Sequence, residues 1–495
     1  MRRFYFITLL LSLLLVVSCE RNNGTIYNIT LSEDNYSCSY DRQTLNVEYR
    51  LMGSIQSDVE VSTSAEWILG VDSSQQSTDG ETGVIKLDIA VNEGAERSAK
   101  VTIRAKGYVS TSFTITQIAA PSDTSHTLMF YFFGTSLNRY FKTNIEDAKA
   151  AISKGVLGEN NRVIYLMQDG RNTARICEIC YDPTNKVCID REIEMINIEG
   201  ELITTEAIGD NIAKMAEYAE ADRYGIVFAS HGQGWIPREV LNGSGGISAL
   251  GMMGVWQQAA GAETTRAFGE NNVQVNPDEL AEGIAMSGVE LDYILFDACF
   301  MANIETIYDL RNSANYIIAS PCEIMGKGFP YHRTLPYLFA AGGATSDIKG
   351  AAESYYKFYK DEYTSSSRCG SVAVFKCSEI ERLTDATRAV VVSAKTEYDA
   401  DVLQTYEGQA VHQFYDFGEW VNAIATDDTA LEAFNNQLSE TIIAKYSLDH
   451  FYSAYGSYGT YPINLEVYSG ATTSAPSKAY PDYWRKTNWY KAVWE

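Results

Sequence analysis

The pattern of apolar and polar positions changes near residue 126, which predicts two parts with different folds. Residues 28–118 alternate apolar and polar positions in short runs separated by Gly, Ser, Asn and Asp. Alternation with a period of two is typical of strands that bury one face, so this part predicts a small all-β, Ig-like sandwich. The expected strands are residues 45–49, 59–62, 84–91, 100–103 and 112–117.

From residue 126 to 495 the apolar positions instead form continuous runs. The runs expected to be buried strands are residues 127–133, 163–167, 225–230, 293–296 and 316–319. Helical periodicity marks residues 144–154 and 206–221, and Asn276-Pro277-Asp278 predicts the start of another helix. Strands that are apolar throughout and alternate with helices predict an α/β domain with a mostly parallel sheet flanked by helices. Residues 174–181 and 187–192 predict an additional hairpin.

The N-terminus has the features of an export signal. A short basic start, Met1-Arg2-Arg3, precedes an apolar stretch at residues 4–17, which is too short to span a bilayer. Val16-Val17-Ser18-Cys19 resembles a bacterial lipobox, and this resemblance implies lipidation of Cys19 and anchoring in the cell envelope, at the outer membrane. A plain secretory signal is the alternative. We expect a signal peptide at 1–18, a tether at 19–27 and a linker at 119–125.

Composition narrows the possible partners. The chain has 495 residues, 45% of them hydrophobic, and a formal charge of −25. This charge argues against nucleic acid as a partner, because a phosphate backbone requires a basic surface. The cysteines are too sparse for a disulfide scaffold. Cys177, Cys180 and Cys188 lack a fourth ligand at metal-site spacing, so we expect packed or surface thiols and no metal.

Two residues with catalytic chemistry follow neighbouring runs of the predicted sheet. Ser230-His231-Gly232 follows the third strand, and Asp297-Ala298-Cys299 follows the fourth. Sites in open α/β sheets form beyond the carboxyl ends of the strands, so we expect His231 and Cys299 to lie together. A free thiol with a pKa of about 8.5 needs a base, which a histidine supplies. The backbone N–H groups of Gly232 and Cys299 are candidates for an oxyanion hole. We expect such a thiol to be partly exposed.

These motifs resemble the clostripain family of cysteine peptidases, which have a caspase-like fold. Further matching blocks are Arg266-Ala267-Phe268-Gly269, Ala319-Ser320-Pro321-Cys322-Glu323, Gly328-Phe329-Pro330-Tyr331 and Trp489-Tyr490-Lys491-Ala492-Val493-Trp494. The resemblance implies a His231–Cys299 dyad, protein or peptide substrates, and cleavage after Arg or Lys with Asp297 lining the P1 pocket. Lys327 departs from the pattern, because some basic-specific members have an acidic residue in this loop. No cofactor is required, although calcium is needed by some members.

The N-terminal part resembles a BACON domain. The residues that carry this resemblance are Ala65-Glu66-Trp67-Ile68, residues 92–99 and Thr114-Ile115-Thr116-Gln117. The resemblance implies either a spacer that lifts the catalytic domain off the membrane or a module that binds glycans. We favour the spacer, because the sequence has no stripe of aromatic residues on which a sugar would stack.

A glycine-rich stretch at residues 236–275 follows the expected catalytic histidine. Long irregular loops in compact domains are usually functional, and members of the resembled family cut themselves in such a loop after a basic residue. Arg238 and Arg266 are the basic residues of this stretch, and we expect Arg238 to be the freer site of cleavage, because Arg266 begins the family block. An uncut lid is the alternative.

Together these features predict an exported, lipid-anchored cysteine endopeptidase. Two alternatives remain at this point, a catalytically silent caspase-like binding lipoprotein and a glycan-binding surface protein.

Overall fold

The chain forms two compact units, which meet in sequence between Ala119 and Ala120. The computed structural model describes residues 27–39, 42–53, 57–92, 97–117, 125–158, 160–170, 172–198, 202–241, 261–265, 275–340, 345–395, 397–456, 458–475 and 477–495. The expected signal peptide, most of the expected linker, Cys19 and Arg266 lie outside these residues.

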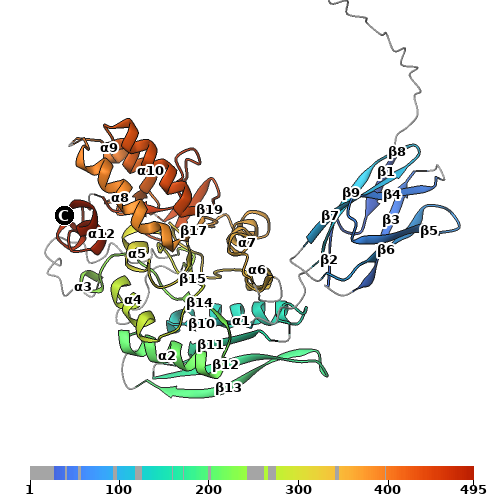
Figure 1. Ribbon diagram of the computed structural model, residues 1–495, viewed down its shortest axis with the longest axis horizontal. Coiled ribbons are helices and arrows are strands. Elements are labelled where there is room, and N and C mark those ends of the chain that lie inside the picture. Colours follow the sequence, from blue (N-terminus) through green and yellow to red (C-terminus); the bar gives the residue numbers. More distant parts are fainter. Residues whose placement is uncertain are drawn as a thin grey trace, which may run out of the picture. The chain divides into compact units, whose positions relative to one another are not determined.

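The first unit consists of two sheets around one core (Figure 1). The five-stranded sheet has the order β5-β6-β3-β1-β8, and the four-stranded sheet has the order β2-β9-β7-β4. The strands are β1 Tyr27–Leu31, β2 Asn35–Cys38, β3 Gln43–Met52, β4 Val59–Thr63, β5 Ile68–Gln76, β6 Thr82–Ile89, β7 Arg97–Ala105, β8 Tyr108–Val109 and β9 Thr111–Gln117. Every second residue of β3 from Val47 to Leu51 is buried, as the alternation predicts.

The second unit is built on a nine-stranded sheet with the order β13-β12-β11-β10-β14-β15-β16-β17-β19. The strands are β10 His126–Phe132, β11 Arg162–Gln168, β12 Thr173–Asp182, β13 Val187–Asn197, β14 Arg223–Ala229, β15 Tyr293–Asp297, β16 Tyr316–Ala319, β17 Val372–Lys376 and β19 Ile442–Tyr446. Neighbours among β11, β10, β14, β15 and β16 pair in parallel. All seven residues of β10 are buried, because helices cover both faces of the sheet.

The outer part of the sheet is antiparallel. The strands β12 and β13 form the expected hairpin at one edge. At the other edge β17 pairs antiparallel with both β16 and β19. The expectation of a mostly parallel sheet therefore holds for the five central strands. Two short sheets, β18 Tyr415–Asp416 with β22 Thr472–Thr473 and β20 His450–Ser453 with β21 Gly459–Pro462, lie outside it.

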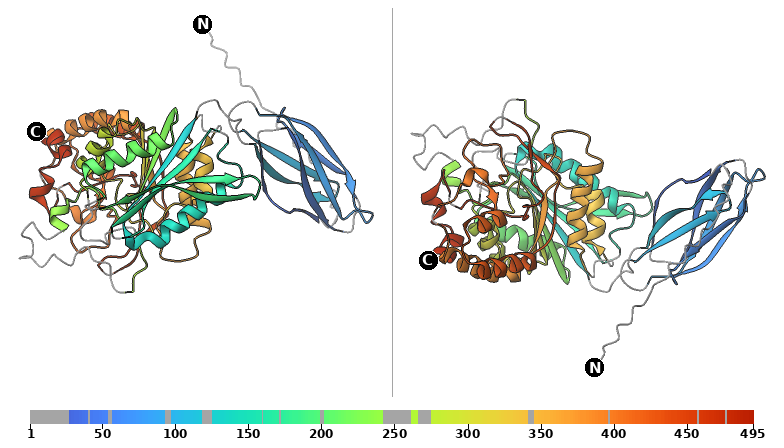
Figure 2. Two further views of the ribbon diagram at one scale, coloured as in Figure 1. Left: turned by 90° about the horizontal axis from the view of Figure 1, so that it is seen from below. Right: turned by 90° about the horizontal axis from the view of Figure 1, so that it is seen from above.

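Helices cover both faces of this sheet, and Figure 2 shows α1 in teal and α2 in green on opposite faces. The helices are α1 Asn138–Ile152, α2 Thr205–Tyr218, α3 Arg238–Leu241, α4 Pro277–Met286, α5 Ile304–Asp309, α6 Tyr331–Leu338, α7 Ile348–Asp361, α8 Ile380–Val392, α9 Phe417–Ile424, α10 Asp428–Thr441, α11 Pro481–Trp484 and α12 Asn488–Trp494. Helix α1 packs on α6, and α2 packs on α4.

The predicted start of α4 forms a capping box. Asn276 caps the helix, Pro277 is its first residue, and the Asn276 N–H donates to the Glu279 carboxylate at 3.0 Å. This cap fixes the point at which the chain enters the helix. Within the described part of the chain, every helix is too short or too polar to cross a membrane.

Candidate active site

The sheet topology brings the two predicted catalytic loops together. Strands β14 and β15 are parallel neighbours, and their last paired residues are Ala229 and Asp297. His231 and Cys299 each follow two residues later, so both lie just beyond the carboxyl ends of these two strands. The prediction that these loops adjoin is therefore confirmed by the strand pairing.

The two loops touch at Gly232. A Cβ atom at this position would lie 2.3 Å from the Cys299 carbonyl oxygen and 2.8 Å from the Cys299 nitrogen. Only glycine permits such an approach between two backbones. The backbone of the residue after His231 therefore lies against the backbone of Cys299.

The Cys299 thiol is held by the loop that follows β16. The Ile324 N–H donates to Cys299 Sγ at 3.0 Å, and the thiol faces the Ile324 carbonyl oxygen at 3.6 Å. Phe300, the next residue, has a left-handed φ of 61° and donates its N–H to the Cys322 carbonyl. The exposed fraction of Cys299 is 0%, so the expectation of a partly exposed thiol is wrong for this structure, because the chain around Ile324 covers it.

The imidazole of His231 is oriented by Ser136. Nε2 of His231 lies 2.9 Å from Ser136 Oγ, and Ser136 is in the short 3-10 helix Thr135–Leu137 after β10. On the other side, the Ser230 hydroxyl donates to the His231 carbonyl oxygen at 2.8 Å. Ser136 belongs to no motif, and only its place after a buried strand at the same sheet edge would have singled it out.

Asp297 is a buried carboxylate that accepts hydrogen bonds from the loop after β16. Its Oδ2 accepts from the Tyr331 hydroxyl at 2.8 Å and from the Phe329 N–H at 3.2 Å. The Lys327 ammonium, in the same loop, lies 5.3 Å from the centre of the Phe358 ring. These contacts are those of a carboxylate that fixes the loop, and the prediction that Asp297 also lines the P1 pocket stays a prediction.

A second buried carboxylate, Glu323, lies beside the residue that contacts the thiol. Its Oε1 accepts from Ser453 Oγ at 2.6 Å and from the Ala454 N–H at 3.1 Å, and its Oε2 accepts from Thr265 Oγ1 at 2.6 Å. Burial raises the pKa of Glu323 to about 7, against the lowering effect of these hydrogen bonds. In the sequence Glu323 appeared only as one letter of a motif.

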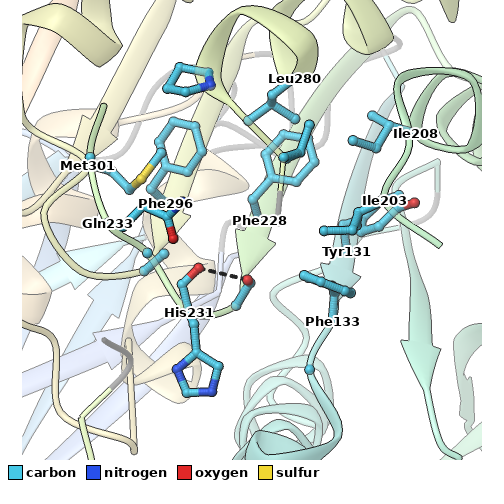
Figure 3. Close-up of a pocket in the computed structure, with 17 residues that line it drawn as sticks. Tyr131, Phe133, Ile203, Ile208, Phe228, His231, Gln233, Leu280, Phe296 and Met301 are labelled. Carbon is cyan, nitrogen blue, oxygen red and sulfur yellow. Dashed lines mark hydrogen bonds between the residues drawn. The ribbon is translucent and has the colours of Figure 1, made fainter. Parts of the chain in front are cut away.

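A cavity of about 90 Å³ lies behind the catalytic loops (Figure 3). Tyr131, Phe228, Phe296, Ile208 and Leu280 supply much of its apolar lining. In Figure 3 the imidazole of His231 points away from these aromatic rings. His231, Gly232 and Ala298 also line this cavity, whereas Cys299 does not.

The other predicted site residues have different settings. Arg238 is the first residue of α3, where its N–H donates to Asn276 Oδ1 at 3.1 Å and its guanidinium lies 2.8 Å from Glu279. Cys177 is buried, Cys180 and Cys188 are half-buried, and all three are free thiols. Among the described residues, no three His, Cys, Asp or Glu side chains are grouped as metal ligands would be.

Comparison with known proteins gives one consistent result for the second unit. The model of the clostripain family, peptidase family C11, matches residues 251–466, a range that includes Cys299. The secreted C11 cysteine protease iotapain of Bacteroides thetaiotaomicron is 29% identical, with a TM-score of 0.62 over 75% of this chain and 100% of that one. No curated protein matches the chain.

Two further solved structures have the same fold. An inactive zymogen C11 protease from Parabacteroides distasonis is 25% identical, with a TM-score of 0.61 over 76% of this chain and 99% of that one. A secreted C11 cysteine protease from Bacteroides thetaiotaomicron in complex with an irreversible peptide inhibitor is 24% identical, with a TM-score of 0.61 over 74% and 98% of the two chains. The caspase-like fold of this family accounts for the second unit.

Proposed function

The chain belongs to the clostripain family of C11 cysteine peptidases, and on this premise we propose that it is an endopeptidase with Cys299 as nucleophile and His231 as base. The observation that carries the proposal is the contact of Gly232 with the Cys299 backbone at the shared edge of β14 and β15. This contact joins the two loops that carry the thiol, the imidazole and two backbone N–H groups, and acyl transfer needs these parts.

The proposed chemistry proceeds through a thioester. His231 takes the thiol proton of Cys299, the thiolate attacks the peptide carbonyl, and the imidazolium then protonates the leaving amine. Because Nε2 of His231 faces Ser136, proton exchange with the thiol falls to Nδ1. The N–H groups of Gly232 and Cys299 would stabilise the oxyanion, and one such donor is worth about 3 kcal/mol. Water then hydrolyses the thioester.

A basic residue at P1, the position before the cleaved bond, is the proposed preference. Asp297 is the acidic residue nearest in sequence to Cys299 and supplies the negative charge for this pocket. The Lys327 ammonium lies over the Phe358 ring, and this position limits the repulsion that its charge would exert on a cationic P1 side chain.

Self-cleavage after Arg266 is the proposed route of activation. Thr265, the residue before it, forms an antiparallel bridge with Met325, and the adjacent Ile324 contacts Cys299 Sγ. Arg238 is less suited, because it begins a helix and is held by Asn276 and Glu279, whereas peptidases bind extended substrates. Arg266 itself lies outside the described residues.

Export and lipid anchoring through Cys19 complete the proposal. The relatives described as secreted C11 proteases support export, and the lipobox-like Val16-Val17-Ser18-Cys19 supports an anchor in the outer membrane. The first unit then serves as a spacer, with glycan binding as the second role suggested by its BACON-like sequence.

An active-site titration tests the core of this proposal. A peptidyl acyloxymethyl ketone with Arg at P1 should label the protein once, at Cys299, as read by mass spectrometry of its peptides. Cys377→Ala is the matched control, because Cys377 is a buried thiol far from the proposed site. It follows Lys376, which pairs with Tyr316 at the amino-terminal end of β16. This variant should be labelled like the wild type, and Cys299→Ala should not be labelled. Labelling at another cysteine with hydrolysis intact would overturn the nucleophile assignment.

A further inference from the structure

The segment Glu263–Thr265 pairs with the chain beside the catalytic thiol in the manner of an extended peptide. Thr265 forms an antiparallel bridge with Met325, and the Gly326 N–H donates to the Thr264 carbonyl at 2.7 Å. Addition of a peptide as an extra strand is a common mode of peptide recognition, in which backbone bonds supply affinity and side-chain pockets supply specificity. The 324–326 stretch is therefore positioned to bind a substrate backbone.

The register of this pairing places the segment on the amino-terminal side of the reacting bond. Ile324, one residue before Met325, donates its N–H to Cys299 Sγ, so the pairing runs directly up to the nucleophile. With cleavage after Arg266, Thr265 occupies the P2 position, Thr264 the P3 position and Glu263 the P4 position. This assignment rests on the proposed function.

The P2 side chain forms a hydrogen bond with a buried carboxylate. Thr265 has an exposed fraction of 0%, and its hydroxyl lies 2.6 Å from Oε2 of Glu323, which is also fully buried. The other oxygen of Glu323 is held by Ser453 and Ala454, so the carboxylate is fixed in place. An apolar side chain of the same shape at P2 would remove this donor and leave the buried Oε2 with the longer bond from the Ala454 N–H, at 3.2 Å.

Contacts further along the segment are weaker or independent of sequence. The Glu263 N–H donates to the Tyr452 hydroxyl at 2.8 Å, a backbone contact that any residue at P4 would make. The Glu263 carboxylate accepts from Ser365 Oγ at 2.5 Å and is itself exposed. Arg139 donates to Thr264 Oγ1 at 3.3 Å near the surface. Exposed contacts of this kind discriminate little.

We propose that Glu323 is the specificity-determining residue for P2, where it selects threonine or serine and rejects apolar and acidic side chains. The preferred substrates are then peptides in which threonine or serine at P2 is followed by a basic residue at P1. The segment 263–265 occupies the substrate groove of its own chain.

Peptide hydrolysis by the wild-type protein at pH 8 tests this assignment without any variant. Four fluorogenic peptides of sequence Glu-Thr-Xaa-Arg, with Thr, Val, Asn or Asp at Xaa, are compared by kcat/KM. The Thr peptide should exceed the Val peptide about ten- to a hundredfold, because a site built to bind a hydroxyl rejects the isostere that lacks one. The Asn peptide should exceed the Asp peptide about tenfold or more, because two carboxylates would meet.

Two variants connect the discrimination to particular residues. Glu323→Gln removes the charge of the side chain. In this variant the kcat/KM of the Asp peptide relative to that of the Asn peptide should therefore rise about tenfold. Tyr452→Phe removes only the backbone contact, so kcat/KM should fall equally for all four peptides while both ratios stay at the wild-type values. Equal kcat/KM for Thr and Val, or for Asn and Asp, in wild type overturns the assignment to Glu323, and so does an unchanged Asp-to-Asn ratio in a folded Glu323→Gln. Failure to hydrolyse any of the peptides would instead count against the proposed peptidase activity.

Discussion

At the scale of single residues, the catalytic geometry depends on a few contacts that differ in what they require of the side chain. Gly232 requires the absence of a side chain, since its Cα approaches the Cys299 backbone. Position 299 holds a sulfur that accepts the Ile324 N–H, and its proposed role as nucleophile requires the same atom. Function and folding therefore make separable demands on neighbouring positions.

Replacing Cys299 with alanine should separate these demands. Cys299→Ala should abolish peptide hydrolysis, because no other group supplies the nucleophile. The free energy of unfolding should fall by only about 1 kcal/mol, since one buried N–H, that of Ile324, loses its acceptor. Initial rates and thermal melting of wild type, Cys299→Ala and the control Cys377→Ala measure both effects. Retention of a tenth of the activity by Cys299→Ala would refute the assignment.

Replacing Asp297 distinguishes a pocket residue from a structural one. If Asp297 faces the P1 side chain, Asp297→Asn should reduce kcat/KM for Arg and Lys substrates far more than for neutral ones, because removing one partner of a buried charge pair is costly. The amide keeps an acceptor for the Tyr331 hydroxyl and the Phe329 N–H, so the loop stays in place. Equal losses across P1 residues would make Asp297 a structural carboxylate alone.

The sequence predicted some of these residues because their chemistry and their place coincide. His231 and Cys299 each follow an apolar run, and parallel neighbouring strands end on the same side of the sheet, so the contact between their loops could be inferred. The contact of Ser136 with His231 and the contact of Thr265 with Glu323 could not be inferred. Serine, threonine and glutamate are common surface residues, and these contacts join positions 95 and 58 residues apart.

At the scale of elements, the central strands and the β12–β13 hairpin were predictable, and the edge formed by β17 and β19 was not. The strands β10, β11, β14, β15 and β16 are buried on both faces, so their sequences are apolar runs that periodicity detects. The strands β17 and β19 are equally short, but their antiparallel addition to the sheet depends on pairing with β16. Local sequence does not specify such long-range pairing.

The segment before Arg266 should control maturation. Arg266→Ala should block self-cleavage, because Thr265 is the residue paired beside the thiol, whereas Arg238→Ala should be cleaved like the wild type. Incubation of both variants, followed by gel analysis and sequencing of new N-termini, measures this. Cys299→Ala is the control for contaminating proteases and should stay intact. A new N-terminus at Glu239 in the wild type would show that α3 is the site.

The loop after β16 should also make stability depend on pH. The pKa of Glu323 is raised by burial from 4.5 to about 7, so between these values the folded state binds a proton that the unfolded state does not. The contribution of Glu323 to the free energy of unfolding is therefore fully present below pH 4.5, falls as the pH rises and levels off above pH 7. The total change is about 3 kcal/mol. The melting temperature of wild type minus that of Glu323→Gln should decrease from pH 5 to pH 8, and a constant difference would contradict the titration.

At the scale of the whole molecule, the two units could be distinguished from their hydrophobic patterns alone. Period-two alternation before residue 118 and apolar runs after residue 126 correspond to two sheets in the first unit and one large sheet in the second. The short apolar segment at residues 4–17 follows neither pattern, and export is its proposed role.

Anchoring should depend on one atom, the sulfur of Cys19. Acyl chains on this cysteine provide the proposed attachment, and every helix among the described residues is too short or too polar to span a bilayer. Cys19→Ser should therefore move the protein from the membrane fraction to the soluble fraction of the cells that produce it, with peptide hydrolysis per molecule unchanged. The control Cys38→Ser alters the next cysteine of the chain, which is buried in the first unit, and should stay with the membrane. Because acyl anchoring does not depend on charge, the wild type should resist a high-salt wash, and a Cys19→Ser protein that also resists it would refute the anchor.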